Sequence, residues 1–336
     1  MKKYLLKENG KFYKANLHMH TTVSDGKMSV EEVKKIYMEK GYSIVAYTDH
    51  EIMVPHNELS DENFLALTST EISINEEINC DFRYVRTYHL NFFSKEKDKK
   101  EFSLFNEKAI WFNHGHNYVT EKQKTKQFNR KYTVDCINEI IKLANEEGML
   151  VSYNHPVWSL QDYNDYINLK GLWGVEWYNN ASSYEGYVDN IKPIDDFLRK
   201  GERVFPLATD DAHILEHCFG GFVMIKADNL EYETIYNALK NGDFYSSMSP
   251  EFYELYIEDG VVNVKTSKVK EIQLTTECRY TKSKHDIYGL TEASFDIKDY
   301  LYRNDNINEH QYIRINIIDL EGNLAYTRAY FKEELL

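Results

Sequence analysis

The stretch His18-Met19-His20-Thr21-Thr22-Val23-Ser24-Asp25-Gly26 is the part of this sequence that decides the fold. It closes a short run, Lys14–His20, whose composition is typical of a β-strand. Alternation along a strand points His18 and His20 to the same side, so that one cation can bind both imidazoles. Asp25 follows in the loop. Two histidines at a strand end and a nearby carboxylate predict a metal site.

The same arrangement recurs along the chain. From about Tyr13 to Ala227, short apolar runs alternate with helical patterns, as in an α/β barrel or a doubly wound sheet. Such barrels place their active sites at the C-terminal ends of the strands. Residues of metal-binding type lie at or near the ends of the predicted strands: His50 after 43–48, Glu71 after 64–68, His89 at the start of 88–93, His155 after 149–153, and Asp211 and His213 after 204–208.

Taken singly, these residues also have ordinary structural explanations. A lone His50 or His89 is more often a hydrogen-bonded core histidine than a ligand, and Asp49 is better explained as a second-shell partner of a ligand or a loop cap. His114 and His116 form another His-x-His pair away from any clear strand, and they are candidate substrate contacts rather than candidate metal ligands. The joint pattern therefore carries the prediction.

The chain divides into two regions by pattern. Residues 1–250 are predicted to form the hydrolase barrel, and alternating runs in 251–336 predict a small β-sandwich-like domain. Residues 94–132 carry ten Lys and Arg against five Asp and Glu and fit no barrel element. They are interpreted as a basic insertion, either a lid or a solvated surface excursion.

The composition limits the classes of function. A formal net charge of −14 argues against sequence-independent binding of duplex nucleic acid, which needs a concentrated basic surface. The apolar runs are too short for a secretory segment or a membrane span, so we expect a cytoplasmic protein without membrane partners. Four widely spaced cysteines predict neither disulfides nor a thiolate zinc site.

These motifs resemble those of one known family. His18–Gly26, Gly41-Tyr42-Ser43-Ile44-Val45-Ala46-Tyr47-Thr48-Asp49-His50, Glu71, His89, Asn154-His155-Pro156 and Asp211-Ala212-His213 resemble, in order, the motifs of the PHP (polymerase and histidinol phosphatase) family of metal-dependent phosphoesterases. The resemblance covers roughly residues 13–250. The segments 241–250 and 313–330 resemble the extra C-terminal β-domain of its CehA/McbA-type metallohydrolase branch.

The resemblance implies a distorted (β/α)7 barrel with a trinuclear metal centre. It assigns His18, His20, Glu71 and Asp211 to one metal, Glu71, His89 and His155 to a second, and Asp25, His50 and His213 to a third. All the ligand atoms are nitrogen or oxygen, so zinc, manganese and iron are each compatible with the site, and up to three divalent ions are expected.

We expect these metals to serve hydrolysis of phosphomonoesters or phosphodiesters. Glu71 would bridge two cations and position a hydroxide between them, with Asp211 as the second catalytic carboxylate. The positive charge of three divalent cations exceeds the negative charge of the three ligand carboxylates. The pocket would therefore be cationic and suited to a phosphoryl group. Asn179, Arg199, His114 and His116 are the candidate substrate contacts.

Three alternatives remain open from the sequence. The same cluster would serve a carboxylic or carbamate ester hydrolase, because the metals also polarise a carbonyl group. A single-stranded nucleic-acid end is an alternative to a small phosphate ester, including a nucleotide, as the substrate. A non-catalytic, metal-stabilised binding module is the third. The sequence does not address oligomeric state.

Overall fold

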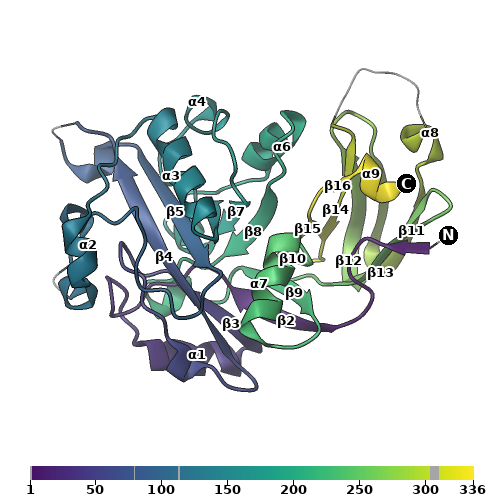
Figure 1. Ribbon diagram of the computed structural model, residues 1–336. Coiled ribbons are helices and arrows are strands. Elements are labelled where there is room, and N and C mark those ends of the chain that lie inside the picture. The colour runs from purple at the N-terminus through teal and green to yellow at the C-terminus, as the bar shows by residue number, and fades with distance from the viewer. Residues whose placement is uncertain (1, 79, 113, 303–309) are drawn as a thin grey trace.

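A computed structural model describes residues 2–78, 80–112, 114–302 and 310–336 of the chain. In this part of the chain the strands are β1 (Lys2–Tyr4), β2 (Lys11–Asn16), β3 (Tyr42–Tyr47), β4 (Leu65–Asn75), β5 (Thr87–Ser94), β6 (Met149–Tyr153), β7 (Gly174–Asn179), β8 (Phe205–Thr209), β9 (Phe222–Ala227), β10 (Phe244–Ser247), β11 (Phe252–Glu258), β12 (Val261–Thr276), β13 (Lys282–Asp296), β14 (Tyr312–Ile318), β15 (Leu324–Thr327) and β16 (Tyr330–Phe331). They belong to one large mixed sheet (Figure 1).

The α-helices of the described residues are α1 (Val30–Glu39), α2 (Glu121–Thr125), α3 (Val134–Glu146), α4 (Tyr163–Tyr166), α5 (Asn180–Tyr184), α6 (Lys192–Arg199), α7 (Tyr232–Asn241), α8 (Lys298–Leu301) and α9 (Lys332–Leu335). Helix α1 begins directly after Ser29. The Ser29 side chain caps the Glu32 amide and Glu32 returns the bond, which closes a capping box. None of the described helices has the length and apolar character needed to cross a membrane.

The sheet carries the strands in the order β2-β3-β4-β5-β6-β7-β8 through the half that holds the predicted ligands. β2, β3 and β4 are parallel, as are β6, β7 and β8, but β5 is antiparallel to both of its neighbours. The link of residues 76–86 explains the reversal after β4, because a parallel crossover needs a dozen or more residues. Since β5 runs the other way, its first residues lie at the edge where the parallel strands end.

The mixed α/β fold predicted from the sequence is confirmed, but the sheet is not closed. The hydrogen-bonded path ends at β8, and no ladder between described residues joins β8 to β9, although the two strands lie close together. β9 pairs instead with β2 and β10, antiparallel to both. The closed (β/α)7 barrel is therefore not found as a continuous ring of hydrogen bonds.

The C-terminal strands extend the same sheet. β10 pairs with β15, and β1 at the N-terminal end pairs with β11, so both chain ends lie beside the C-terminal strands in Figure 1. One hydrophobic cluster joins Val33 of α1 to Leu255 of β11 and Ile315 of β14. A domain boundary at residue 250 and a separate sandwich-like domain remain predictions.

The basic insertion is packed onto the core. Phe102, Leu104 and Phe105 are buried and share a hydrophobic cluster with Ile137 and Ile141 of α3. Burying these side chains contributes on the order of 1.5–3 kcal/mol each to folding. A solvated surface excursion therefore does not describe this apolar stretch, even though most lysines of the insertion are exposed.

Candidate metal centre

The nine predicted ligands converge on one region at the strand ends. Their nitrogen and oxygen atoms fall into three groups within which one ligand atom from each residue lies within 4.8 Å of the others. The groups are His18, His20, Glu71 and Asp211; Glu71, His89 and His155; and His20, Asp25, His50 and His213. These match the predicted sets, with His20 added to the third.

The first group is the most deeply buried. Asp211 Oδ1 lies 3.1 Å from Nε2 of both His18 and His20. Oε1 of Glu71 lies 3.3 Å from His18 Nε2, and Oε2 lies 3.3 Å from His20 Nε2. The side chains of His18, His20 and Glu71 are almost fully shielded from solvent.

Glu71 connects the first group to the second. Its Oε1 atom is 3.2 Å from His89 Nδ1 and 3.5 Å from His155 Nε2. A carboxylate that faces two sets of imidazoles is placed to bridge two cations. The antiparallel β5 brings His89 here from the beginning of its strand, while Glu71 lies within β4, beyond its parallel pairing with β3.

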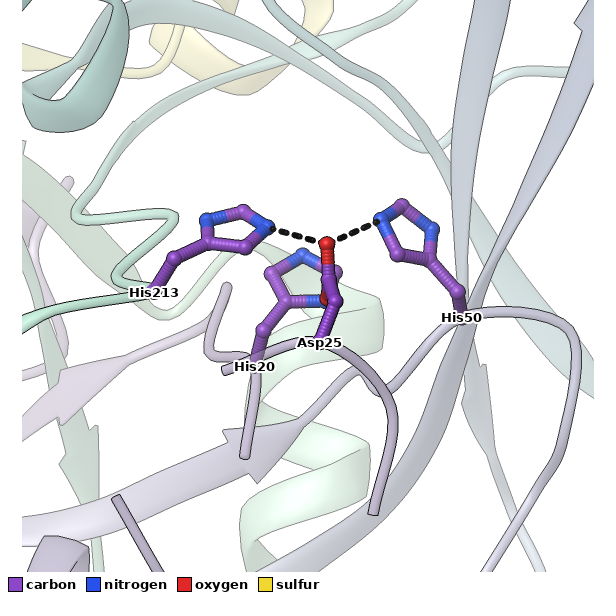
Figure 2. Close-up of side chains that lie close together, drawn as sticks. All are labelled: His20, Asp25, His50 and His213. Carbon is purple, nitrogen blue, oxygen red and sulfur yellow. Dashed lines mark ion pairs between the residues drawn. The ribbon is translucent and has the colours of Figure 1, made fainter. Parts of the chain in front are cut away.

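The third group gathers around Asp25 (Figure 2). Asp25 Oδ2 lies 3.4 Å from His213 Nε2 and 3.9 Å from His50 Nε2, and His20 stands between the two rings. The side chains of Asp25 and His213 are 21% and 28% exposed. This group is therefore the open face of the cluster.

The donor atoms are better satisfied by divalent cations than by contacts with one another. His20 Nδ1 and His50 Nδ1 are buried without a hydrogen bond, although charged or polar groups lie nearby. An unsatisfied buried polar atom costs about 1–3 kcal/mol, so such a set needs a further partner. Imidazole nitrogens and carboxylate oxygens that point at common centres supply the ligand types that zinc, manganese and iron accept.

The carboxylates control the charge of the buried imidazoles. Burial alone would lower the pKa of His20, but contacts with Asp211 and Glu71 raise that pKa to about 10. The pKa of His155 rises to about 9 because Glu71 and Asp211 outweigh burial. Conversely, although burial opposes it, the surrounding histidines hold the pKa of the Glu71 carboxyl well below its ordinary value. Without a cation, protons on His20 and His155 offset part of the carboxylate charge, whereas burial, together with the neighbouring His20, lowers the pKa of His50 to about 3.

Glu176, on β7, is a site residue that the sequence prediction missed. Its Oε1 atom accepts a 2.8 Å bond from His18 Nδ1 and a 2.7 Å bond from Thr209, while Oε2 accepts from the His155 amide. A proton held on His18 Nδ1 leaves the Nε2 lone pair free for a cation. The available signal was a single acid inside the apolar run Val175-Glu176-Trp177, a position where an unpaired charge is costly.

Polar side chains around the cluster orient its ligands. Asn154 Nδ2 donates to Glu71 Oε1 at 2.8 Å, and Asn179 Nδ2 donates to Glu176 and Asp211 at 2.9 and 3.1 Å. Asp49 accepts bonds from the backbone and hydroxyl groups of both Thr21 and Ser24, and so shapes the loop that carries Asp25. The contacts of Asp49 fit the loop-cap interpretation.

Strained backbone accompanies the ligands. His155 and Asp211 have positive φ angles of 25° and 52°, and Glu51, immediately after His50, has a φ of 65°. Non-glycine residues avoid this region, and such strain concentrates at functional sites. These turns aim side chains from three different strand ends toward one centre.

The other candidate substrate contacts lie apart from this geometry. Arg199 ends α6 and donates to the backbone carbonyl of Glu277 at 3.1 Å, toward the C-terminal strands. His114 and His116 are exposed on the insertion, with His116 Nδ1 3.7 Å from Glu107. Neither histidine belongs to the three ligand groups. A substrate role for these three residues stays a prediction.

No family model matches the chain, and none of the curated proteins matches it. Solved structures with similar coordinates include a two-domain protein from Bacteroides vulgatus containing a predicted PHP-like metal-dependent phosphoesterase, at 13% identity, TM-score 0.43 and 98% coverage of both chains. An amidohydrolase from Chromobacterium violaceum matches at 13% identity and TM-score 0.40, over 59% of this chain and 87% of its own.

A third similar structure is a lesion-specific endonuclease from Pyrococcus furiosus, at 15% identity and TM-score 0.38, over 69% of this chain and 56% of its own. Identities and TM-scores at this level do not transfer an activity to this chain.

Proposed function

We propose that this chain is a metal-dependent hydrolase of phosphate esters. The observation that carries the proposal is the convergence of nine histidine and carboxylate side chains in three groups that share Glu71 and His20. Structural networks rarely bury so many ionisable groups, because desolvating them is costly unless they bind ions or serve chemistry. The buried His20 Nδ1 and His50 Nδ1 atoms, which have no hydrogen bond, support the same interpretation.

Divalent cations held by these residues would polarise a phosphoryl oxygen and lower the pKa of a water molecule. The chain's own contribution is to place the ligands. Glu71 faces all three groups, because Oε1 lies near His18, His89 and His155 and Oε2 lies near His20 and His50. Asn154 fixes that carboxylate through its 2.8 Å bond to Oε1. Glu176 holds the proton of His18 on Nδ1, and Asn179 restrains both Glu176 and Asp211. Asp25, at the open face, is within reach of an arriving group.

The number of metal ions, the cellular location and the C-terminal region are part of the same proposal. Three cations are proposed because the nine predicted ligands form three groups; a fourth group, His18, His155 and Glu176, adds only Glu176, whose Oε1 atom already bonds His18. Zinc, manganese and iron all suit nitrogen and oxygen donors. A cytoplasmic location is proposed as well. The region 251–336 is proposed as a second domain that continues the sheet of the hydrolase region.

A substrate panel with paired metal analysis tests the proposal. The purified protein is assayed on phosphomonoesters, phosphodiesters, and carboxylic and carbamate esters, and the same sample is analysed for metals by mass spectrometry. We expect phosphate ester cleavage together with two or three equivalents of metal. Cleavage of carboxylic or carbamate esters alone would replace the proposal with the alternative hydrolase, and a metal-loaded but inert protein would favour a binding module.

Matched histidine variants make the assignment specific. His18→Ala should abolish turnover and lose metal, whereas His285→Ala, which changes an exposed histidine on β13, should leave both unchanged. Glu71→Gln should abolish turnover with the fold retained by circular dichroism. Full activity in either site variant would overturn the metal-centre assignment.

A further inference from the structure

Trp111, in the basic insertion, presents an indole to solvent beside the metal centre. Its side chain is 64% exposed, and its ring centroid lies 6.0 Å from that of His50. The neighbours Ile110 and Phe112 are buried, so the backbone on either side of the indole is anchored. An exposed tryptophan on a fixed segment loses little conformational entropy when it binds a flat group.

Trp158 lies near the same cluster from a different loop, shortly after His155. Its ring centroid is 5.5 Å from His89 and 5.2 Å from His155. The indole N–H donates to Glu185 Oε2 at 2.8 Å, and this bond fixes the ring orientation. The side chain remains partly exposed.

The two indoles are connected by the rings of His50 and His89, which are themselves largely shielded from solvent. The His50 and His89 ring centroids are 5.7 Å apart, so Trp111, His50, His89 and Trp158 follow one another at ring spacings of about 6 Å or less. The most exposed ligands, Asp25 and His213, belong to the same group as His50, whereas His18 is fully buried. A substrate that approaches the exposed ligands therefore passes close to the two indoles.

We propose that Trp111 and Trp158 form an aromatic subsite that binds the planar ring of the substrate's leaving group. This inference rests on the proposed function, because it names the class of phosphate ester that the centre would cleave: one whose alcohol carries an aryl ring or a nucleobase. Hydrolysis of that ester breaks the bond between phosphorus and the ester oxygen. Water supplies hydroxide to phosphorus and a proton to the departing oxygen.

Ligand binding tests the subsite independently of turnover. Phenylphosphonate and methylphosphonate, which have no ester bond to cleave, are titrated into the manganese-loaded protein by calorimetry. We expect Trp111→Ala to weaken phenylphosphonate binding by about 5- to 100-fold, the range found for stacking of one ring, and to leave methylphosphonate binding unchanged. Trp111→Phe, which keeps a ring, should retain most of the affinity.

Two further variants guard the result. Trp158→Phe, a smaller change at a partly buried position, should selectively weaken the binding of phenylphosphonate, but by less than Trp111→Ala does. Tyr288→Ala removes a highly exposed aromatic ring on β13 and should have no effect. Equal loss of both phosphonates, or no loss of phenylphosphonate in Trp111→Ala, would overturn the subsite.

Steady-state kinetics then distinguish an aryl group from a nucleobase as the ring that the subsite binds. Phenyl phosphate, a nucleoside monophosphate and an oligonucleotide with a terminal phosphate are compared in wild type and Trp111→Ala. Selective loss of kcat/KM for the nucleotide substrates assigns a nucleobase, and loss for phenyl phosphate alone assigns an aryl group. If wild type cleaves none of them, the proposed function fails, while the phosphonate titration still decides the subsite.

Discussion

Arg130 Nη1 lies 2.6 Å from Glu51 Oε2, and both side chains are buried. Arg130 belongs to the basic insertion, and Glu51 follows the ligand His50 directly. The guanidinium also donates twice to the Leu104 carbonyl, while Glu51 Oε1 accepts from the Ser73 amide. This pair therefore fastens the insertion that carries Trp111 to the loop of the proposed ligand His50.

Removing one member of this pair should destabilise the protein. Arg130→Met leaves the Glu51 carboxylate buried and unpaired, which costs about 3–5 kcal/mol. Urea denaturation measures the free energy of unfolding, and Lys126→Met, at an exposed position of the same insertion, is the control. Adding Glu51→Gln should recover part of the loss. If Arg130→Met and Lys126→Met had the same free energy of unfolding, the pair would not fasten the insertion.

Glu176→Gln should weaken metal binding while preserving the fold. The carboxylate accepts bonds from four donors, His18, Thr209, Asn179 and the His155 amide, and an amide group cannot accept all of them. Loss of such a ligand partner typically lowers metal affinity about 10- to 100-fold. Metal content after dialysis against graded chelator gives the affinity, with Glu147→Gln, at the end of α3, as control. Unchanged affinity would rule out this positioning role.

Metal binding should release protons near neutral pH. With pKa values raised to about 10 and about 9, His20 and His155 are protonated in the ion-free protein, whereas a cation requires the neutral imidazole. Because protons compete with the cation below these pKa values, apparent affinity should fall as pH drops from about 8 to about 6. Calorimetry in two buffers with different ionisation enthalpies measures the release. Heats independent of the buffer would contradict this account.

His114→Ala should leave metal content unchanged. The side chain is exposed on the insertion and belongs to none of the ligand groups in the described part of the chain. His213→Ala, which removes a member of the open group around Asp25, should lose about one metal equivalent. Mass spectrometry of both variants makes the comparison. A lost equivalent in His114→Ala would assign the insertion to the metal centre.

Much of the site was predictable because strand periodicity and strand ends are local features. His18 and His20 alternate within one run, and His155 and Asp211 follow apolar strands directly. Glu176 was missed because its role depends on a contact with His18, 158 positions away. The placement of Phe102, Leu104 and Phe105 was missed because a high lysine content masks their burial against α3.

The order of residues along the chain is enough to place imidazoles and carboxylates at the strand ends, and hence to indicate the chemistry that the protein can support. The open sheet, the antiparallel β5 that brings His89 from its first residues, and the contact of Trp111 with His50 follow from tertiary packing. The reason is physical. Ligand type is a property of each side chain, whereas strand direction and long-range contact depend on the packing of segments far apart in the chain.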